Sequence, residues 1–241
     1  MSLKWPESLL ERSFHLDVES QIQPDDISCG IVCLRMMLGY IGVSVSYDDL
    51  LKMIPPHPDI GLYDSHVGTI ARALGFSCAI YSYNYQIFCP IWNRLDKKEL
   101  LEKLEIKKKN QRESSRILAT QSYIDFLKSG GDILFYPLSK ELILSHLDQN
   151  LPLIVALDMT FLYDCVPMMD EYSGEKATHF VVLHGFDSES CSFELSDPWH
   201  SNPLPNNNGR YFIDADRLIN AVLLGQDKND SALIVIENKK E

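Results

Sequence analysis

The chain is short of positive charge. Its 241 residues include 22 lysines and arginines against 34 aspartates and glutamates, which gives a formal net charge of −12. Because an acidic surface repels phosphates, nucleic acid is not an expected partner, and a neutral or cationic ligand is easier to accommodate. The sequence also lacks a glycine-rich phosphate loop and an obvious pair of metal-binding carboxylates. We therefore expect no cofactor and no bound metal.

Long hydrophobic runs and closely paired cysteines are also missing. The segments "LPLIVAL" and "FVVLHGF" have the length of strands and fall well short of the roughly 18 apolar residues of a membrane span. The start of the chain, "MSLKWPESLLERSFHLD", has no apolar core of the kind that a signal peptide needs. The six cysteines form no Cys-x-x-Cys pair, and the spacing of Cys29 and Cys33 is unlike that of common zinc sites. These features predict a cytoplasmic protein with reduced thiols and no membrane span.

What the chain does contain is a series of helical patterns followed by strand patterns. A helix is predicted over about residues 29–41, apolar on most sides, with Ser28 as N-cap and Gly42 as stop. Further helices are predicted at "SYDDLLKMI" and "DSHVGTIARALGF". Strands are predicted at 152–158, "HFVVLHGF", "CSFELSDP" and "SALIVIE". The predicted helices come first along the chain and most of the predicted strands come late, and this order favours an α+β fold with a C-terminal antiparallel sheet.

The middle of the chain has a different character. The stretch "LDKKELLEKLEIKKKNQRESSRILATQSYIDFLKSG" is charged and helical in pattern, with glutamates and lysines able to pair at one-turn spacing. We interpret residues of about 85–135 as a charged helical insertion in a single domain that spans residues 1–241. This insertion is a candidate surface for a protein partner.

Cys29 stands where a polar loop meets the predicted buried helix. A cysteine is a good nucleophile only as thiolate, and an unperturbed thiol is mostly protonated at neutral pH. The unpaired N–H groups and the positive dipole end of a helix N-terminus favour the anion. Gly30 beside it is expected to leave room for a substrate backbone, whereas Cys33, one turn further in, is expected to be an inert core residue. Cys29 is therefore the candidate nucleophile.

A thiolate nucleophile needs a base and a group that orients that base. If "HFVVLHGF" and "CSFELSDP" form a hairpin centred near residue 188, His179 and Asp197 are each nine residues from the centre. They are then predicted to lie directly opposite each other, within hydrogen-bonding reach. His184 has the other parity and is expected to point to the opposite face of the sheet.

A reaction at a carbonyl also needs a donor to the developing oxyanion. The backbone N–H of Cys29 can supply one hydrogen bond, and a side-chain amide upstream can supply another. Gln23, six residues before Cys29, is the first candidate, and Gln21 competes with it. Three other residues are candidates to line a cleft: His66, Trp199 and His200.

These motifs resemble a known family. "Gln23-Pro-Asp-Asp-Ile-Ser-Cys29-Gly30", "Thr178-His179-Phe-Val-Val-Leu-His-Gly" and "Ser196-Asp197-Pro198" are similar to the double-glycine leader peptidases of bacteriocin-exporting ABC transporters. Those are papain-like cysteine peptidases. The resemblance implies that Cys29 is the nucleophile, His179 the general acid/base, Asp197 its orienter and Gln23 the oxyanion donor. It covers about residues 18–75 and 140–236, and leaves out the charged middle.

The sequence departs from that family in three ways. Ser28 stands where the family usually has aspartate, the transporter membrane segments are missing, and the middle is longer than in the compact peptidase domain. The chain is thus closer to stand-alone relatives of the family. One such group, in eukaryotes, carries a guanylyl-cyclase label, and "GQDKNDSALIVIE" resembles its C-terminal stretch.

Three functions are therefore weighed. The favoured one is a cysteine peptidase-like hydrolase of papain-like α+β fold that cleaves or transfers at an amide bond, with a peptide or small amide as substrate. The second is a catalytically idle peptide-binding module of the same fold, although such modules usually lose the cysteine that this chain retains. The third function is nucleotide cyclisation, which no sequence motif supports.

Overall fold

A single sheet forms the centre of the part of the chain that the computed structural model describes, residues 9–54, 61–165, 172, 177–204, 208–228 and 231–239. Its strands are β1 (Phe14–His15), β2 (Ser77–Ser82), β3 (Asp132–Leu134), β4 (Leu153–Asp158), β5 (Thr178–Asp187), β6 (Ser192–Ser196), β7 (Arg210–Asp214) and β8 (Ala232–Glu237). The strand order is β3-β2-β8-β4-β5-β6-β7, with β1 paired to β5. The strand pairs are antiparallel except β2 with β3, which is parallel.

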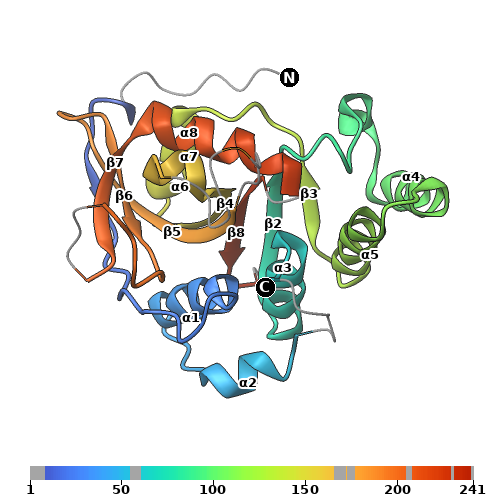
Figure 1. Ribbon diagram of the computed structural model, residues 1–241, viewed down its shortest axis with the longest axis horizontal. Coiled ribbons are helices and arrows are strands. Elements are labelled where there is room, and N and C mark those ends of the chain that lie inside the picture. Colours follow the sequence, from blue (N-terminus) through green and yellow to red (C-terminus); the bar gives the residue numbers. More distant parts are fainter. Residues whose placement is uncertain are drawn as a thin grey trace.

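Helices cover both faces of this sheet (Figure 1). The α-helices are α1 (Cys29–Tyr40), α2 (Tyr47–Leu51), α3 (Asp64–Ala73), α4 (Lys97–Asn110), α5 (Ser114–Lys128), α6 (Lys140–Leu147), α7 (Met159–Tyr163) and α8 (Ala215–Leu224). Two short 3₁₀ helices are η2 (Pro90–Arg94) and η3 (Gly225–Lys228). None of the helices within the described ranges has the length and apolar character that crossing a bilayer requires.

The central strands are buried on both faces, which explains their nearly continuous hydrophobic runs. Ile154 of β4 and Phe180 of β5 belong to one apolar cluster, together with residues of α1, α3 and α5. Their chain neighbours Val155 and Val181 belong to a second cluster, together with residues of α6, α7 and α8. Because successive side chains of a strand point to opposite faces, each face receives its own apolar layer.

Helix α1 is the buried element that the apolar pattern predicts, and its bounds agree with the predicted 29–41 to one residue. The chain leaves the helix at Gly42, which has φ +87°, a conformation that glycine adopts without steric cost. The role expected for Gly30 is wrong. Gly30 is buried, and a Cβ there would lie 3.2 Å from Val67 Cγ2 and 3.4 Å from Phe180 Cδ2. Glycine at this position therefore lets α3 and β5 pack closely against α1.

The charged middle forms α4 and α5, which lie side by side beyond the β3 edge of the sheet (Figure 1). Helix α5 is not a purely solvated element, because Tyr123 and Phe126 are fully buried. The aromatic ring of Phe126 occupies the space beside Gly68 of α3, where a Cβ would lie 2.6 Å from Phe126 Cε2. Packing of α5 on α3 thus extends the first apolar cluster outward from the sheet.

The predicted fold class is confirmed: helices from the first part of the chain pack on a largely antiparallel sheet built mostly from the C-terminal part. The parallel pair of β2 and β3 is the addition that the sequence pattern did not indicate. This arrangement brings the N-terminus of α1 to the central strand β5.

Candidate active site

Cys29 is the first residue of α1, as predicted. Ser28 occupies the N-cap position, but its side chain makes no capping hydrogen bond, and the first turn contains no acidic residue. The positive end of the helix dipole is therefore not offset by a carboxylate of that turn. Cys29 is half-buried, whereas Cys33 is fully buried and its pKa is raised well above the usual value, chiefly by burial.

His179 and Asp197 form a buried hydrogen-bonded pair. His179 Nε2 lies 2.8 Å from Asp197 Oδ1, and the two side chains are 4% and 0% exposed. Their pairing was predicted, but the predicted register is wrong. The observed pairs are Val182 with Ser196 and, beyond a bulge at His184, Gly185 with Glu194. The centre of the hairpin turn lies further along the chain than residue 188, and the bulge adds one residue to β5. Asp197 is therefore not directly opposite His179, and its side chain contacts His179 from a diagonal position.

Asp197 accepts hydrogen bonds from five donors. Its Oδ1 accepts from His179 Nε2 and, at 2.9 Å, from the backbone N–H of Trp199. Its Oδ2 accepts from Tyr211 Oη at 2.7 Å, from Asn202 Nδ2 at 2.9 Å and from the hydroxyl of Tyr163. Burial is the largest single influence and favours the neutral acid, but the His179 charge and these hydrogen bonds outweigh it and lower the pKa of Asp197. The carboxylate therefore stays ionised although it is fully buried.

The same pair controls the charge on His179. Burial is the largest single influence and acts to lower the pKa of His179. The charge and the hydrogen bond of Asp197 act to raise this pKa, and the Cys29 side chain raises it further through a hydrogen bond and its charge. Together they bring the pKa of His179 to about 10. An imidazolium between a thiol and a carboxylate is thus favoured at neutral pH. The structure brings Cys29, His179 and Asp197 into one continuous set of contacts.

Gln23 is buried next to this set, in the loop before α1. Its backbone N–H donates to the carbonyl of Pro198 at 2.8 Å, which ties the loop to the segment that carries Asp197. Its side-chain Nε2 donates to the carbonyl of Asp25 at 2.6 Å, and among the described residues its Oε1 is buried without a hydrogen-bond partner. Gln23 therefore lies where its backbone links the two halves of the site, while its amide is held by its own loop.

The other predicted cleft residues have different surroundings. The Trp199 ring lies edge-on to His179 with ring centroids 6.5 Å apart, so it packs against the candidate general base. His66 is buried at the start of α3, where its Nδ1 accepts from the backbone N–H of Tyr63 at 3.3 Å, a helix-capping contact. His200 is exposed. Of the three, Trp199 is in ring contact with the Cys29–His179–Asp197 set.

The sequence reasoning missed the donors around Asp197. Asn202 follows it closely in a turn and could have been considered as a partner. Tyr163 and Tyr211 come from α7, which packs against β5, and from β7, which pairs with β6, so their side chains converge on Asp197 only in the folded chain. A single sequence carries no local signal for such a contact.

Comparison with known protein families finds a match over most of the chain. A sequence model described as the Peptidase_C39 like family matches residues 15–210. The chain belongs to this family. The resemblance to double-glycine leader peptidases is thereby supported, whereas the resemblance to guanylyl-cyclase-labelled relatives is not. No curated protein matches this C39-like chain.

Several solved structures are similar to this C39-like protein at low identity. A Bacillus anthracis protein classed as a C39-like peptidase is 16% identical, with a TM-score of 0.48 and coverage of 95% of this chain and 100% of that chain. Xylellain, a cysteine protease from Xylella fastidiosa, is 12% identical, with a TM-score of 0.48 and coverage of 99% and 91%. A double glycine motif protease from an AMS/PCAT transporter, solved in complex with the leader peptide, is 14% identical, with a TM-score of 0.45 and coverage of 94% and 95%.

Proposed function

We propose that this C39-like protein is a thiol-dependent hydrolase that cleaves or transfers at an amide bond. Cys29 is the nucleophile, His179 the general acid/base and Asp197 the group that orients His179. The observation that carries this proposal is the continuous contact from the half-buried Cys29 at a helix N-terminus, through His179, to the ionised and buried Asp197. Membership of a peptidase family supports the same reaction class.

The first half of the reaction uses the thiolate–imidazolium pair. The Cys29 sulfur attacks the carbonyl carbon and forms a C–S bond, and the carbonyl π electrons move onto oxygen. The backbone N–H of Cys29 and an N–H of the Gln23 amide donate to this oxyanion. When the tetrahedral intermediate collapses, the C–N bond breaks and His179 gives its proton to the leaving amine.

The second half restores the site. The thioester on Cys29 is attacked by water, which loses a proton to His179, or by another amine in a transfer reaction. Collapse breaks the C–S bond, releases the acid or the new amide and regenerates the thiolate–imidazolium pair. Asp197 remains ionised throughout, because its five hydrogen bonds stabilise the carboxylate, and the imidazolium adds to this whenever His179 is protonated.

A peptide is the proposed substrate. One structural neighbour holds a leader peptide, which makes a peptide the first substrate class to test here. The net charge of −12 favours a neutral or cationic peptide over an acidic one. The six free cysteines suit a reducing compartment, and we propose the cytoplasm as the location. Within the proposed single domain, the α4–α5 insertion is the proposed surface for a protein partner.

A covalent trap tests the proposal. Intact protein is treated with a panel of peptide aldehydes and peptide chloromethylketones, and the modified residue is identified by mass spectrometry of fragments. The expected result is one adduct on Cys29 that is absent from Cys29→Ala and retained in Cys89→Ala, another half-buried cysteine. Modification spread evenly over the half-buried cysteines would contradict the nucleophile assignment.

The same variant separates an enzyme from an idle peptide-binding module. In an enzyme, Cys29→Ala abolishes turnover of a peptide that the wild-type protein cleaves, while the variant still binds that peptide. In an idle module, the wild-type protein binds peptide with no turnover. Fluorescence anisotropy of labelled peptides, read alongside cleavage by chromatography, distinguishes the two results.

A further inference from the structure

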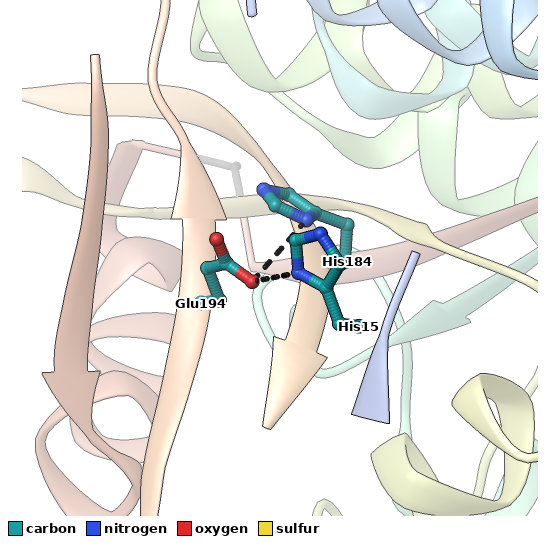
Figure 2. A group of neighbouring side chains, drawn as sticks. All are labelled: His15, His184 and Glu194. Atoms are coloured by element: carbon teal, nitrogen blue, oxygen red, sulfur yellow. Dashed lines mark hydrogen bonds and ion pairs between the residues drawn. The ribbon is translucent and has the colours of Figure 1, made fainter. Parts of the chain in front are cut away.

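Three side chains with metal-ligand atoms meet on neighbouring strands outside the Cys29–His179–Asp197 set (Figure 2). They are His15 of β1, His184 of β5 and Glu194 of β6, and their ligand atoms all lie within 4.8 Å of one another. His15 Nδ1 lies 2.7 Å from Glu194 Oε2, and His184 Nδ1 lies 3.8 Å from the same oxygen.

The strand register explains how residues so far apart in sequence meet here. Gly185 of β5 pairs with His15 on one side and with Glu194 on the other. The bulge in β5 lies beside this row, at His184, and bulges re-aim side chains. A Cβ at Gly185 would lie 2.6 Å from Glu194 Oε2 and 2.9 Å from the carbonyl oxygen of Phe14. Glycine between the two paired residues is what leaves the Glu194 carboxylate room to face the imidazoles.

Two of the three side chains in this cluster lie inside the protein. His184 is fully buried and the Glu194 side chain is 11% exposed, whereas the His15 side chain is 59% exposed. A carboxylate is rarely buried unless it is paired or coordinates a metal. His15 closes the cluster on its solvent side, so an ion could enter there and a water molecule could complete its coordination.

The second nitrogen of His184 is already supported. His184 Nε2 lies 3.0 Å from Ser196 Oγ, the kind of outer contact that orients a metal-ligating histidine. His184 Nδ1 lies 3.1 Å from the carbonyl oxygen of Leu16, a bond that metal binding would replace. The carbonyl oxygen of Leu16 also accepts a hydrogen bond from the backbone N–H of Val18 at 2.8 Å. It therefore keeps one hydrogen bond when His184 Nδ1 binds a metal ion instead.

We propose that His15, His184 and Glu194 bind one divalent transition-metal ion, with zinc as the first choice. Two imidazole nitrogens and one carboxylate oxygen are a ligand set that suits zinc. In a tetrahedral site with bonds of about 2.0–2.2 Å, neighbouring ligand atoms are roughly 3.3–3.6 Å apart. The separations here bracket that range, and the exposed His15 side chain has the freedom to adjust.

Arg210 is a cation whose charge acts on His184, but its hydrogen bond and ion pair are with other groups. Arg210 of β7 donates to the carbonyl of Val18, and its guanidinium lies 3.7 Å from Asp17 Oδ1. Two neutral imidazoles and one carboxylate carry a single negative charge, which a divalent ion would more than offset. The acidic chain as a whole favours that cation.

An ion here would tie the N-terminal segment to the sheet. Strand β1 is only two residues long, and it precedes the loop that carries Gln23 and leads to Cys29 at the start of α1. Strands β5 and β6 carry the other two ligands and lead to His179 and Asp197. The metal site is independent of the proposed peptidase reaction, and its expected effect is to stabilise this junction. Its ligands are spread from residue 15 to residue 194, which is why the sequence predicted no metal.

The test uses full-length protein stripped of metal with a chelator and carrying Cys29→Ala, because a thiol beside an imidazole can itself bind zinc. Zinc binding is measured by isothermal titration calorimetry, and the coordination by the visible absorption of the cobalt(II) form. The expected result is one ion per chain with the absorption of a tetrahedral nitrogen–oxygen site, and a higher unfolding temperature with zinc.

Four variants locate the ion, and each is checked for folding by circular dichroism. His15→Ala and Glu194→Gln should each weaken zinc binding by more than the roughly 10–100-fold expected for the outer partner in Ser196→Ala. His200→Ala, which removes another exposed histidine, should leave it unchanged. No zinc binding to the parent, or binding that survives both His15→Ala and Glu194→Gln in folded protein, would overturn the proposal.

Discussion

Replacing Asp197 by asparagine tests the electrostatic basis of the proposed site, because it removes one charge and keeps the side-chain shape. Asp197 is the main cause of the high pKa of His179, while burial alone acts to lower it. In Asp197→Asn, the pKa of His179 should therefore fall from about 10 to its ordinary 6.5 or below. A histidine whose folded pKa is raised contributes stability that is fully present below the unfolded pKa and is lost as pH rises through the folded pKa.

The magnitude follows from these two values. With a folded pKa of about 10 and an unfolded pKa of about 6.5, this contribution falls by about 3 kcal/mol between pH 6 and pH 9. His179 is fully buried, so solvent screening reduces this figure little. In Asp197→Asn the loss should vanish, and stability should stay level or rise over the same window because a buried neutral histidine resists protonation.

Two measurements check this prediction. Urea denaturation at pH 6, 7.5 and 9 gives the free energy of unfolding of each protein, and nitrogen-15 NMR of labelled histidine rings follows the protonation of His179 directly. Asp187→Asn, which removes a half-buried carboxylate at the end of β5, is the matched control, and its stability should depend on pH as in wild type. If wild type and Asp197→Asn lose the same stability between pH 6 and pH 9, or if His179 titrates alike in both, the reasoning is refuted.

Three further substitutions give independent tests. Tyr211→Phe removes one donor to the buried carboxylate of Asp197 and should cost about 1.5–3 kcal/mol of unfolding free energy, measured in urea; an unchanged value would show that the bond adds nothing. Gln23→Ala should lower kcat of peptide cleavage by about 10²–10³-fold with little change in KM. An effect on KM alone would contradict the role of Gln23 as an oxyanion donor. Gly185→Ala places a Cβ against the Glu194 carboxylate and should lower the free energy of unfolding by about 1–3 kcal/mol. Amide hydrogen exchange should then show faster opening of β1. Amide protection in β1 equal to that of wild type would contradict the close approach of Gly185 and Glu194.

The local elements were predictable because their causes lie close together in the sequence. The bounds of α1 follow from an apolar run between a capping position and Gly42. Ser46 caps α2 by accepting from the backbone N–H of Asp49, three residues further along the chain. The late strands appear where their hydrophobic runs predict them, and with them the α+β class. Placing Cys29 at a helix start needed only this level of reasoning.

The contacts between strands depended on tertiary structure. The pairing of His179 with Asp197 was predicted with the wrong register, because whether a hairpin contains a bulge depends on the packing of both its faces. The hydroxyls around Asp197 come from α7 and β7, and the His15–His184–Glu194 cluster joins β1 to β5 and β6, which lie far from it in the sequence. By itself, the sequence determined which segments are helices and strands and which thiol begins a buried helix, since these depend on neighbouring residues. Only the tertiary structure decided which buried charges meet, because those distances are set by how the packed elements fit together.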